Sequence, residues 1–276
     1  MSFDRIAVGI KTFLRDDKLF HTINHVRRNL PDAQLMIADD GEMTEEKESL
    51  YAELIQEGHK VFILPFDSGY GAKSNKIIDN LQRDFLLVGS DDFDFSPASV
   101  SLGIERLVAA LDRSPELSLV SGRLANRGSY EFYIRDQGDI IEEIPIPDFY
   151  WQTGWTYQPA DLTVNYSLIR RNVFWTEGLE TNENGTGWVE KRTSIAFDDE
   201  EVIGEGGHGT FFLDVKRAGL KVGFVPGVEI SEQTGEDSLR YRQYRARASR
   251  PSRKCFEKRN IRRWVLGNGV VDYNKE

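Results

Sequence analysis

The first 120 residues alternate between short apolar segments and longer mixed segments, and this alternation limits the fold more than any other feature of the chain. Five apolar segments have the length and composition of buried strands: 6–10, 35–38, 61–64, 85–89 and 117–120. The segments between them, 16–30, 44–58, 73–83 and 97–113, are typical of helices. Strands that alternate with helices predict an α/β fold, with a mainly parallel sheet flanked by helices.

The fourth apolar segment ends in three carboxylates, Asp91, Asp92 and Asp94. Ligands of open α/β sheets bind at the carboxyl ends of the strands. Carboxylates crowded together repel one another unless a cation offsets their charge. A hard divalent ion that also binds substrate phosphates would suit this position. The alternative is a solvated turn that leads into a helix at Ser96 and Pro97.

Composition excludes some classes of protein. No apolar run approaches 18 residues, so we expect no transmembrane segment. Met1–Arg5 leads directly into the first strand, and we expect no signal peptide. The lone Cys255 rules out an internal disulfide and suits a reducing compartment. We therefore expect a cytoplasmic protein, or one in the host cytoplasm if the source is viral.

The second half is less regular. Strand-like runs occur at 130–134, 140–144, 162–166 and 221–226, and 207–218 is typical of a helix. The loop 149–157 carries Trp151, Trp155 and Tyr157, which would either stack on a sugar or acceptor base or fill a small satellite core. We predict two parts: a domain over 1–235 and a basic, helical C-terminal extension over 236–276.

The extension differs in charge from the rest of the chain. Residues 240–276 contain twelve Lys or Arg and three acids, for a net charge of +9, and residues 1–239 carry −19. The Arg-rich stretch 240–263 suits phosphate contacts. It would bind a nucleic acid, bind an anionic membrane or lipid-linked acceptor, or dock on the acidic body of the same chain.

Together these segments resemble glycosyltransferases of the GT-A fold, in particular family 2-like enzymes and N-acetylgalactosaminyltransferases. The resemblance covers residues 6 to about 232. The segments that carry it are Lys11-Thr12-Phe13, Ile37-Ala38-Asp39-Asp40-Gly41, Gly69-Tyr70-Gly71-Ala72-Lys73-Ser74-Asn75, Ser90-Asp91-Asp92-Phe93, His208-Gly209-Thr210-Phe211-Phe212-Leu213 and Ala218-Gly219-Leu220-Lys221-Val222-Gly223-Phe224-Val225-Pro226.

The resemblance implies a nucleotide-sugar site. Its members would be Thr12, Asp39, Asp40, Gly71, Lys73 and Asp91. Asp39 or Asp40 would accept hydrogen bonds from the nucleoside, and Lys73 would offset diphosphate charge. The plainer interpretations are a turn aspartate before Gly41, an ordinary glycine-rich loop and a surface lysine.

The resemblance also implies Mn²⁺ or Mg²⁺. Asp92 is the first candidate ligand. Its companion is Asp94 by the usual spacing of the family's acids, or Asp91 by an alignment through Phe93, which leaves Ser90 where an acid is usual. A late metal-binding histidine is replaced here by Glu232. That residue would serve as an oxygen ligand or lie on the surface.

The sequence offers more than one candidate for the catalytic base. Inverting enzymes of this fold use a carboxylate to take the acceptor proton. The family's acid before the histidine is replaced by Gly207 here. Glu205, Asp199 of the acidic run 198–201, and His208 itself remain candidates, and a solvated acidic loop is the alternative.

The expected function is metal-dependent transfer of a sugar from a nucleotide sugar, most simply a UDP-sugar, to a hydroxyl with inversion. The basic extension points to DNA as the acceptor, through a hydroxylated base, as in some bacteriophage enzymes. One alternative is a glycan or lipid-linked acceptor. Another is a non-enzymatic nucleic-acid-binding protein that uses residues 240–263. Nucleotidyl transfer is disfavoured because 9–14 lacks a glycine-rich loop.

Overall fold

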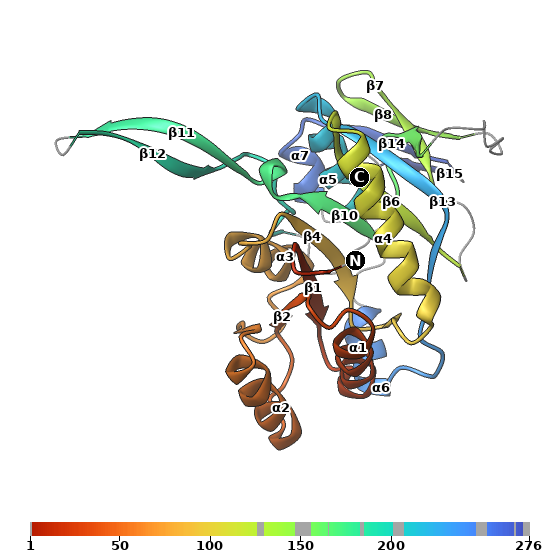
Figure 1. The fold of residues 1–276 in the computed structure, drawn as a ribbon. Coiled ribbons are helices and arrows are strands. Elements are labelled where there is room, and N and C mark those ends of the chain that lie inside the picture. Colours follow the sequence, from red (N-terminus) through yellow and green to blue (C-terminus); the bar gives the residue numbers. More distant parts are fainter. Residues whose placement is uncertain are drawn as a thin grey trace.

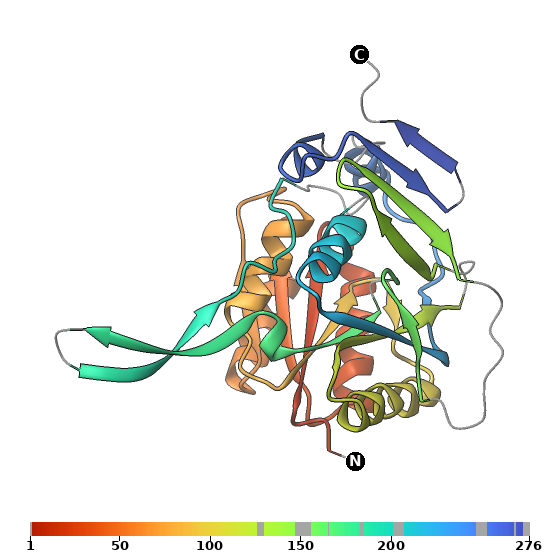
Figure 2. The same ribbon diagram turned by 90° about the horizontal axis from the view of Figure 1, so that it is seen from above.

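The computed structural model describes residues 2–125, 130–146, 156–164, 166–182, 185–200, 207–246, 253–267 and 269–272. Its main feature is a twisted central sheet with helices on both faces (Figures 1 and 2). In spatial order its strands are β3 (Lys60–Ile63), β2 (Gln34–Asp39), β1 (Ile6–Thr12), β4 (Phe85–Ser90), β10 (Ser167–Arg170), β6 (Leu117–Leu124), β13 (Lys221–Glu232) and β5 (Phe93–Asp94), and β9 (Gln158–Ala160) pairs with β13. The predicted α/β fold is confirmed.

Strand direction accounts for where the site forms. The strands β3, β2, β1 and β4 run parallel, and so do β6 and β13. Only β10, β9 and β5 run antiparallel to their neighbours. The carboxyl ends of β1, β2 and β4 therefore meet at one edge of the sheet, with Thr12 opposite Asp39 and Lys11 opposite Ser90.

The helices cover the two faces unequally. One core layer packs α1 (Asp16–Asn29), α2 (Glu45–Gln56) and α4 (Ala98–Arg113) on the sheet. The other packs α3 (Tyr70–Asp79) and α5 (Gly207–Arg217) on the opposite face. In β1, Ile6, Val8 and Ile10 face the first layer, and Ala7 faces the second. Gly9 also belongs to the α3 side, where an added Cβ would lie 3.1 Å from Ile77, so a small residue lets α3 pack closely.

The prediction that the C-terminal segment is a helical extension is wrong, because the segment also contains two strands. It contains the short helices α6 (Leu239–Arg245) and α7 (Arg253–Glu257), then β14 (Arg263–Leu266) and β15 (Gly269–Asp272). These strands join β8 (Ile140–Pro145) and β7 (Phe132–Asp136) in a second sheet with the order β15-β14-β8-β7. Trp264 is buried there and donates to Glu143 Oε1 at 2.9 Å. Pairing with a distant strand overrides the local helical pattern.

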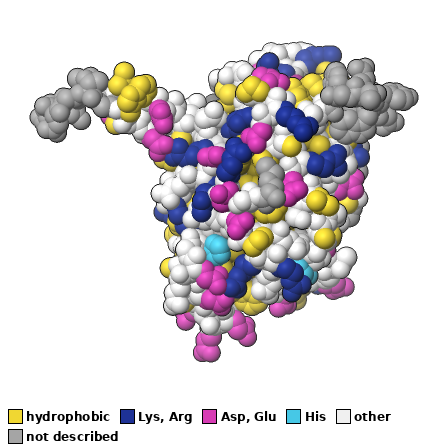
Figure 3. All heavy atoms as spheres, in the orientation of Figure 1, with side chains coloured by type: hydrophobic (Ala, Val, Ile, Leu, Met, Phe, Trp, Pro, Cys, Tyr) yellow, Lys and Arg dark blue, Asp and Glu magenta, His cyan; other side chains and the backbone are white. Residues whose placement is uncertain are grey.

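The middle of the chain also differs from expectation. The predicted strand 162–166 is not formed over its described residues; Leu162 makes an isolated bridge to Phe132, and β9 and β10 lie on either side. After the 3₁₀ turn Arg171–Val173, the strands β11 (Trp175–Asn182) and β12 (Gly185–Arg192) form a hairpin that projects from the body (Figure 1). Figure 3 shows apolar side chains on this arm, where Leu179 and Trp188 are 61% and 70% exposed.

Two further sequence-based expectations concern the aromatic loop and the membrane. Trp151 and Trp155 lie outside the described residues. Tyr157 packs against the core and donates to Glu116 Oε1 at 2.8 Å, as a satellite-core residue would. In the part of the chain that the structure describes, no helix has both the length and the apolar character needed to span a membrane.

Candidate active site

Asp91 and Asp92 converge on one cation, the guanidinium of Arg15. Arg15 lies just after β1, and its Nη1 is 2.7 Å from Asp92 Oδ2. Its Nε is 3.2 Å from Asp91 Oδ2, and its Nη2 contacts Asp91 Oδ1. The other side of the guanidinium meets the ring of Tyr241 in α6, with 4.5 Å from Cζ to the ring centroid. Arg15 is 12% exposed at its side chain, so the pair of carboxylates is neutralised within a nearly closed site.

The two carboxylates differ in their electrostatics. Asp91 is fully buried, and burial raises its pKa although Arg15 opposes the shift. Burial also acts to raise the pKa of Asp92, but Arg15 and a hydrogen bond from Ser90 outweigh it and hold that pKa below its usual value. Burial would lower the pKa of Arg15, and the two aspartates raise it instead. Arg15 therefore remains charged at any pH at which the protein is folded.

Asp39 and Asp40, at the end of β2, are both buried, and both form hydrogen bonds and an ion pair. Asp39 accepts from the Tyr51 hydroxyl at 2.7 Å and pairs with Lys47 at 3.0 Å. Its other oxygen accepts from the backbone of Gly41 at 2.8 Å, which is the turn interaction anticipated as the plainer alternative. Asp40 binds Lys73 Nζ at 2.5 Å and the Gly69 amide at 2.8 Å, and burial raises its pKa.

Lys73 is buried rather than exposed, so the interpretation as a surface lysine is wrong. It lies in the first turn of α3, where Gly69 takes a φ of 95° and opens the helix. Besides Asp40, its ammonium donates to the Thr12 carbonyl at 3.1 Å. The hydroxyl of Thr12 is buried at the end of β1, on the side of Asp91. A helix N-terminus beside a lysine suits an anionic group.

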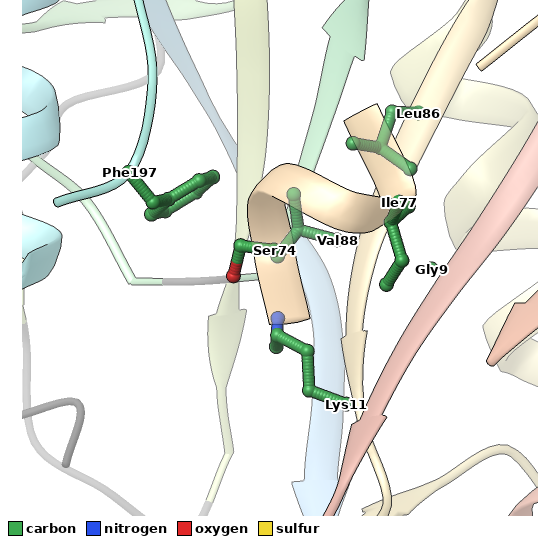
Figure 4. Close-up of a pocket in the computed structure, with 7 residues that line it drawn as sticks. All are labelled: Gly9, Lys11, Ser74, Ile77, Leu86, Val88 and Phe197. Atoms are coloured by element: carbon green, nitrogen blue, oxygen red, sulfur yellow. The ribbon is translucent and has the colours of Figure 1, made fainter. Parts of the chain in front are cut away.

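Lys11 is a buried cation between β1 and α3. Figure 4 shows its side chain extending toward Ser74, with Phe197 across the small pocket. Its Nζ lies 4.8 Å from the ring centroid of Tyr70. Burial, with the charge of Lys73 nearby, lowers the pKa of Lys11 to about 7. The pocket is lined by β1, β4 and α3, and Lys11 is its residue nearest to the strand ends that carry the acids.

The segment that contains Asp199 packs directly on α3. Asn75 donates to the Phe197 carbonyl at 2.7 Å and to Asp199 Oδ1 at 2.6 Å. Gly71 faces the Asp198 backbone, and Asp198 pairs with Lys258 at 2.9 Å and Arg259 at 2.7 Å. Asp199 therefore lies against α3.

The other two candidate bases are less defined. Glu205 lies outside the described residues. His208 is in the first turn of α5, where its backbone is described and its side chain is not. The identity of the base stays a prediction.

Asp94 and Glu232 lie at different places around Asp92. Asp94 accepts from the Ser96 amide at 2.9 Å and faces His21 Nε2 at 3.3 Å, toward α1. Glu232 ends β13 opposite Phe93, and the next residue, Gln233, donates from its backbone to the Asp92 carbonyl at 2.6 Å. The backbone of residues 232 and 233 therefore lies beside that of residues 92 and 93, and a ligand role for Glu232 stays a prediction.

The donor chemistry at Asp91 and Asp92 fits a hard divalent ion, because the two carboxylates already share one cation. Among the described residues, no three His, Cys, Asp or Glu side chains gather into a metal site. Phosphate oxygens of a donor would have to complete the ligand set.

Several residues of the site escaped the sequence analysis. The burial of Lys47 and Tyr51 could have been predicted from the sequence, because both lie with Leu54 on one face of α2 at helical spacing. Arg15 follows a strand at the same sheet edge as the acids, but only the fold shows that its side chain reaches them. No sequence pattern indicated a role for Gln233. Its side-chain amide donates to the backbone of Asp91 at 3.1 Å and to Thr22 at 2.8 Å.

The basic C-terminal segment docks on the body. In α6, Tyr244 packs against Phe13 and Phe66 with centroids 5.3 and 5.5 Å away. Further along, the ion pairs are Arg240 with Glu42, Lys254 with Glu200, Lys258 with Asp198, Arg259 with Asp198 and Asp214, and Arg262 with Asp139. Figure 3 shows basic and acidic side chains interspersed over this side of the molecule. Intramolecular docking, one of the three sequence-based interpretations, accounts for much of the segment's charge.

Comparisons with known proteins agree with this geometry. A family model described as glycosyl transferase family 2 matches residues 7–178. The mouse beta-1,4 N-acetylgalactosaminyltransferase 2 is 27% identical over 232 residues, 83% of this chain and 39% of that protein. The chain spans between 20% and 39% of the length of the two curated relatives, human and mouse, that head the matches.

Two solved structures share the fold. S. aureus TarS 1-349 in complex with UDP-GlcNAc has a TM-score of 0.55 at 10% identity, over 94% of this chain and 64% of that one. The mannosyltransferase PcManGT from Pyrobaculum calidifontis, in complex with GDP-Man and Mn²⁺, has a TM-score of 0.50 at 9% identity, over 88% and 60%. The first is a complex with a nucleotide sugar and the second is a mannosyltransferase, and the fold of this chain is GT-A.

Proposed function

Because this chain belongs to glycosyl transferase family 2, we propose that it transfers a sugar from a nucleotide sugar to an acceptor hydroxyl. The observation that carries the proposal is the convergence of paired acids from the ends of β2 and β4, the two strands that flank β1: Asp39 with Asp40 and Asp91 with Asp92, beside buried cations. A UDP-sugar is the favoured donor, supported by the bound UDP-GlcNAc of the TarS structure.

The donor's charged groups have complementary groups in this site. The diphosphate would bind against the N-terminus of α3 and Lys73, which exchanges part of its contact with Asp40 for phosphate. Asp39 is held by Lys47 and Tyr51, so it would act through its fixed position on the nucleoside side.

A divalent ion, Mn²⁺ or Mg²⁺, belongs to the proposal. Asp92 and Asp91 would hold it, and Asp94, turned to His21 and Ser96, is the weaker second ligand. When bound, such an ion offsets the charge that develops on the departing nucleoside diphosphate. The Mn²⁺ complex of the mannosyltransferase neighbour supports this part of the proposal.

The acceptor proposed here is a carbohydrate hydroxyl, by analogy with the named activity of the N-acetylgalactosaminyltransferase relative. Asp199, held by Asn75, is the described candidate for the base that takes the acceptor proton with inversion. DNA as acceptor stays a prediction from the basic segment, whose ion pairs with the body weaken its support. The cytoplasmic location likewise stays a prediction.

The first test is nucleoside diphosphate release from a panel of nucleotide sugars, with Mn²⁺ or a chelator. Asp92→Asn should abolish metal-dependent release, and Asp94→Asn should retain most of it. Release unaffected by either substitution, or by the chelator, would contradict the assigned metal ligands. Each reaction is run with N-acetylhexosamine-terminated glycans and with hydroxymethylated duplex DNA, and stimulation by one of them identifies the acceptor class.

A further inference from the structure

One guanidinium binds both acids at the end of β4. Arg15 uses Nε and Nη2 on the two oxygens of Asp91 and Nη1 on Asp92 Oδ2. Three of the four carboxylate oxygens are therefore already bonded to Arg15. A divalent ion that took these oxygens as ligands would have to displace the guanidinium from them, because both cations need the same oxygen lone pairs.

Arg15 is placed so that it can be exchanged. It comes from the short loop between β1 and α1, after Leu14, which takes a φ of 54°. Besides the two aspartates, its side chain contacts the ring of Tyr241 in α6. Asp91 and Asp92 are instead fixed at the strand end, where Gln233 binds the backbone of both residues. The carboxylates are the rigid partners and the arginine is the adjustable one.

We propose that Arg15 and the divalent ion are alternative cations for Asp91 and Asp92. In the donor-free protein Arg15 holds the two carboxylates, and it leaves them when the ion enters together with the donor diphosphate. The diphosphate supplies further oxygen ligands to the ion, so the ion bound together with the donor competes better with the guanidinium for the carboxylates than the ion alone. This inference rests on the proposed metal-dependent transfer and adds an order of binding. The ion binds weakly to the protein alone and strongly when the nucleotide is bound.

The direct test measures Mn²⁺ affinity without donor, from the electron paramagnetic resonance signal of free Mn²⁺. Arg15→Gln should bind Mn²⁺ about tenfold more tightly than the wild type, because a competing unit charge is removed. Adding Asp92→Asn to Arg15→Gln should abolish that gain. Equal or weaker Mn²⁺ binding by a folded Arg15→Gln protein would overturn the inference, because a purely structural arginine predicts that result.

A second pair of variants leaves the aspartates and Arg15 intact. Tyr241→Leu removes the ring over Arg15 and should tighten donor-free Mn²⁺ binding by about threefold, the value of a modest cation–π contact. Tyr244→Leu is the matched control in the same helix, since its ring packs on Phe13 and Phe66. An equal effect of both substitutions would contradict the exchange.

The same titrations with UDP present separate this inference from the proposed function. Wild type should then bind Mn²⁺ tightly, and the difference between wild type and Arg15→Gln should shrink. If Mn²⁺ binds with UDP and the donor-free affinities of the two proteins are equal, only the exchange is wrong. If Mn²⁺ binds none of the proteins even with UDP, the metal-dependent transfer and the exchange are both wrong.

Discussion

Gly71 and Asp198 are in such close contact that a Cβ on the glycine would lie 1.9 Å from the Asp198 carbonyl oxygen. The contact joins the first turn of α3 to the segment that carries Asp199 and Phe197. Both sides are backbone, so neither can rotate away. The absence of a side chain at 71 is therefore what allows this segment to cover α3.

Gly71→Ala should separate α3 from residues 197–199. We expect a loss of about 2–4 kcal/mol in the free energy of unfolding, as for other overpacked buried sites, and a higher KM for the donor. Gly178→Ala is the control, since nothing lies within 4 Å of its added Cβ. Denaturant unfolding of both variants measures the difference. Wild-type stability in Gly71→Ala would mean that the two backbones separate easily.

Lys47 neutralises Asp39 from a fully buried position. It lies 3.0 Å from Asp39 and 2.7 Å from Asp16. Lys47→Met should cost about 3–5 kcal/mol, because it leaves a buried carboxylate without its cation. Lys191→Met, which breaks the exposed pair with Glu180, should change stability by less than about 1 kcal/mol. Thermal unfolding of the two variants gives the comparison, and similar losses would show that Asp39 does not depend on Lys47.

Lys11 predicts a specific pH dependence. Its pKa falls from 10.5 to about 7 on folding, so between these values the unfolded chain binds more protons than the folded one. The free energy of unfolding should therefore rise as pH increases from 7 toward 10, by about 1 kcal/mol per pH unit from this group. Lys11→Met should lose that contribution and be more stable than wild type at pH 7. Parallel stability curves for the two proteins across this range would contradict the assignment.

Asp198 anchors the C-terminal segment to the body. Burial acts to raise its pKa, but Arg259 and Lys258 outweigh burial and lower it to about 2. This stabilisation should be complete above pH 4 and lost as pH falls toward 2. At pH 7, Asp198→Asn should cost about 1–3 kcal/mol and weaken the docking of α7. Asp139→Asn, at the exposed pair with Arg262, is the control.

The docking of α7 on the body can be measured by hydrogen exchange at the backbone amides of residues 253–261. Asp198→Asn should speed exchange there, and Asp139→Asn should leave it near the wild-type rate. If the two variants exchange alike, the buried network does not hold the segment.

Much of the fold was predictable because its determinants are local. Apolar runs such as 85–89 and the helical pattern of 16–30 predicted the strands and helices of the first half, and parallel pairing predicted the sheet edge at which Asp39, Asp40, Asp91 and Asp92 meet. The end of the chain was not predictable. Trp264 forms a strand because β8 and Glu143, over 120 residues away, supply its pairing and its hydrogen bond.

The sequence by itself determined which chemical groups gather at the strand ends, since residue order and strand direction place them there. Only the tertiary structure decided which groups neutralise them. Arg15 meets Asp91, Lys73 meets Asp40 and Lys47 meets Asp16, each more than 30 positions away along the chain, and Asp94 is drawn to His21 instead of joining Asp92. A buried charge pairs with whichever opposite charge lies close to it in the folded protein, and the strength of the pair depends on burial. Neither the distance nor the burial can be deduced from the spacing of residues along the sequence.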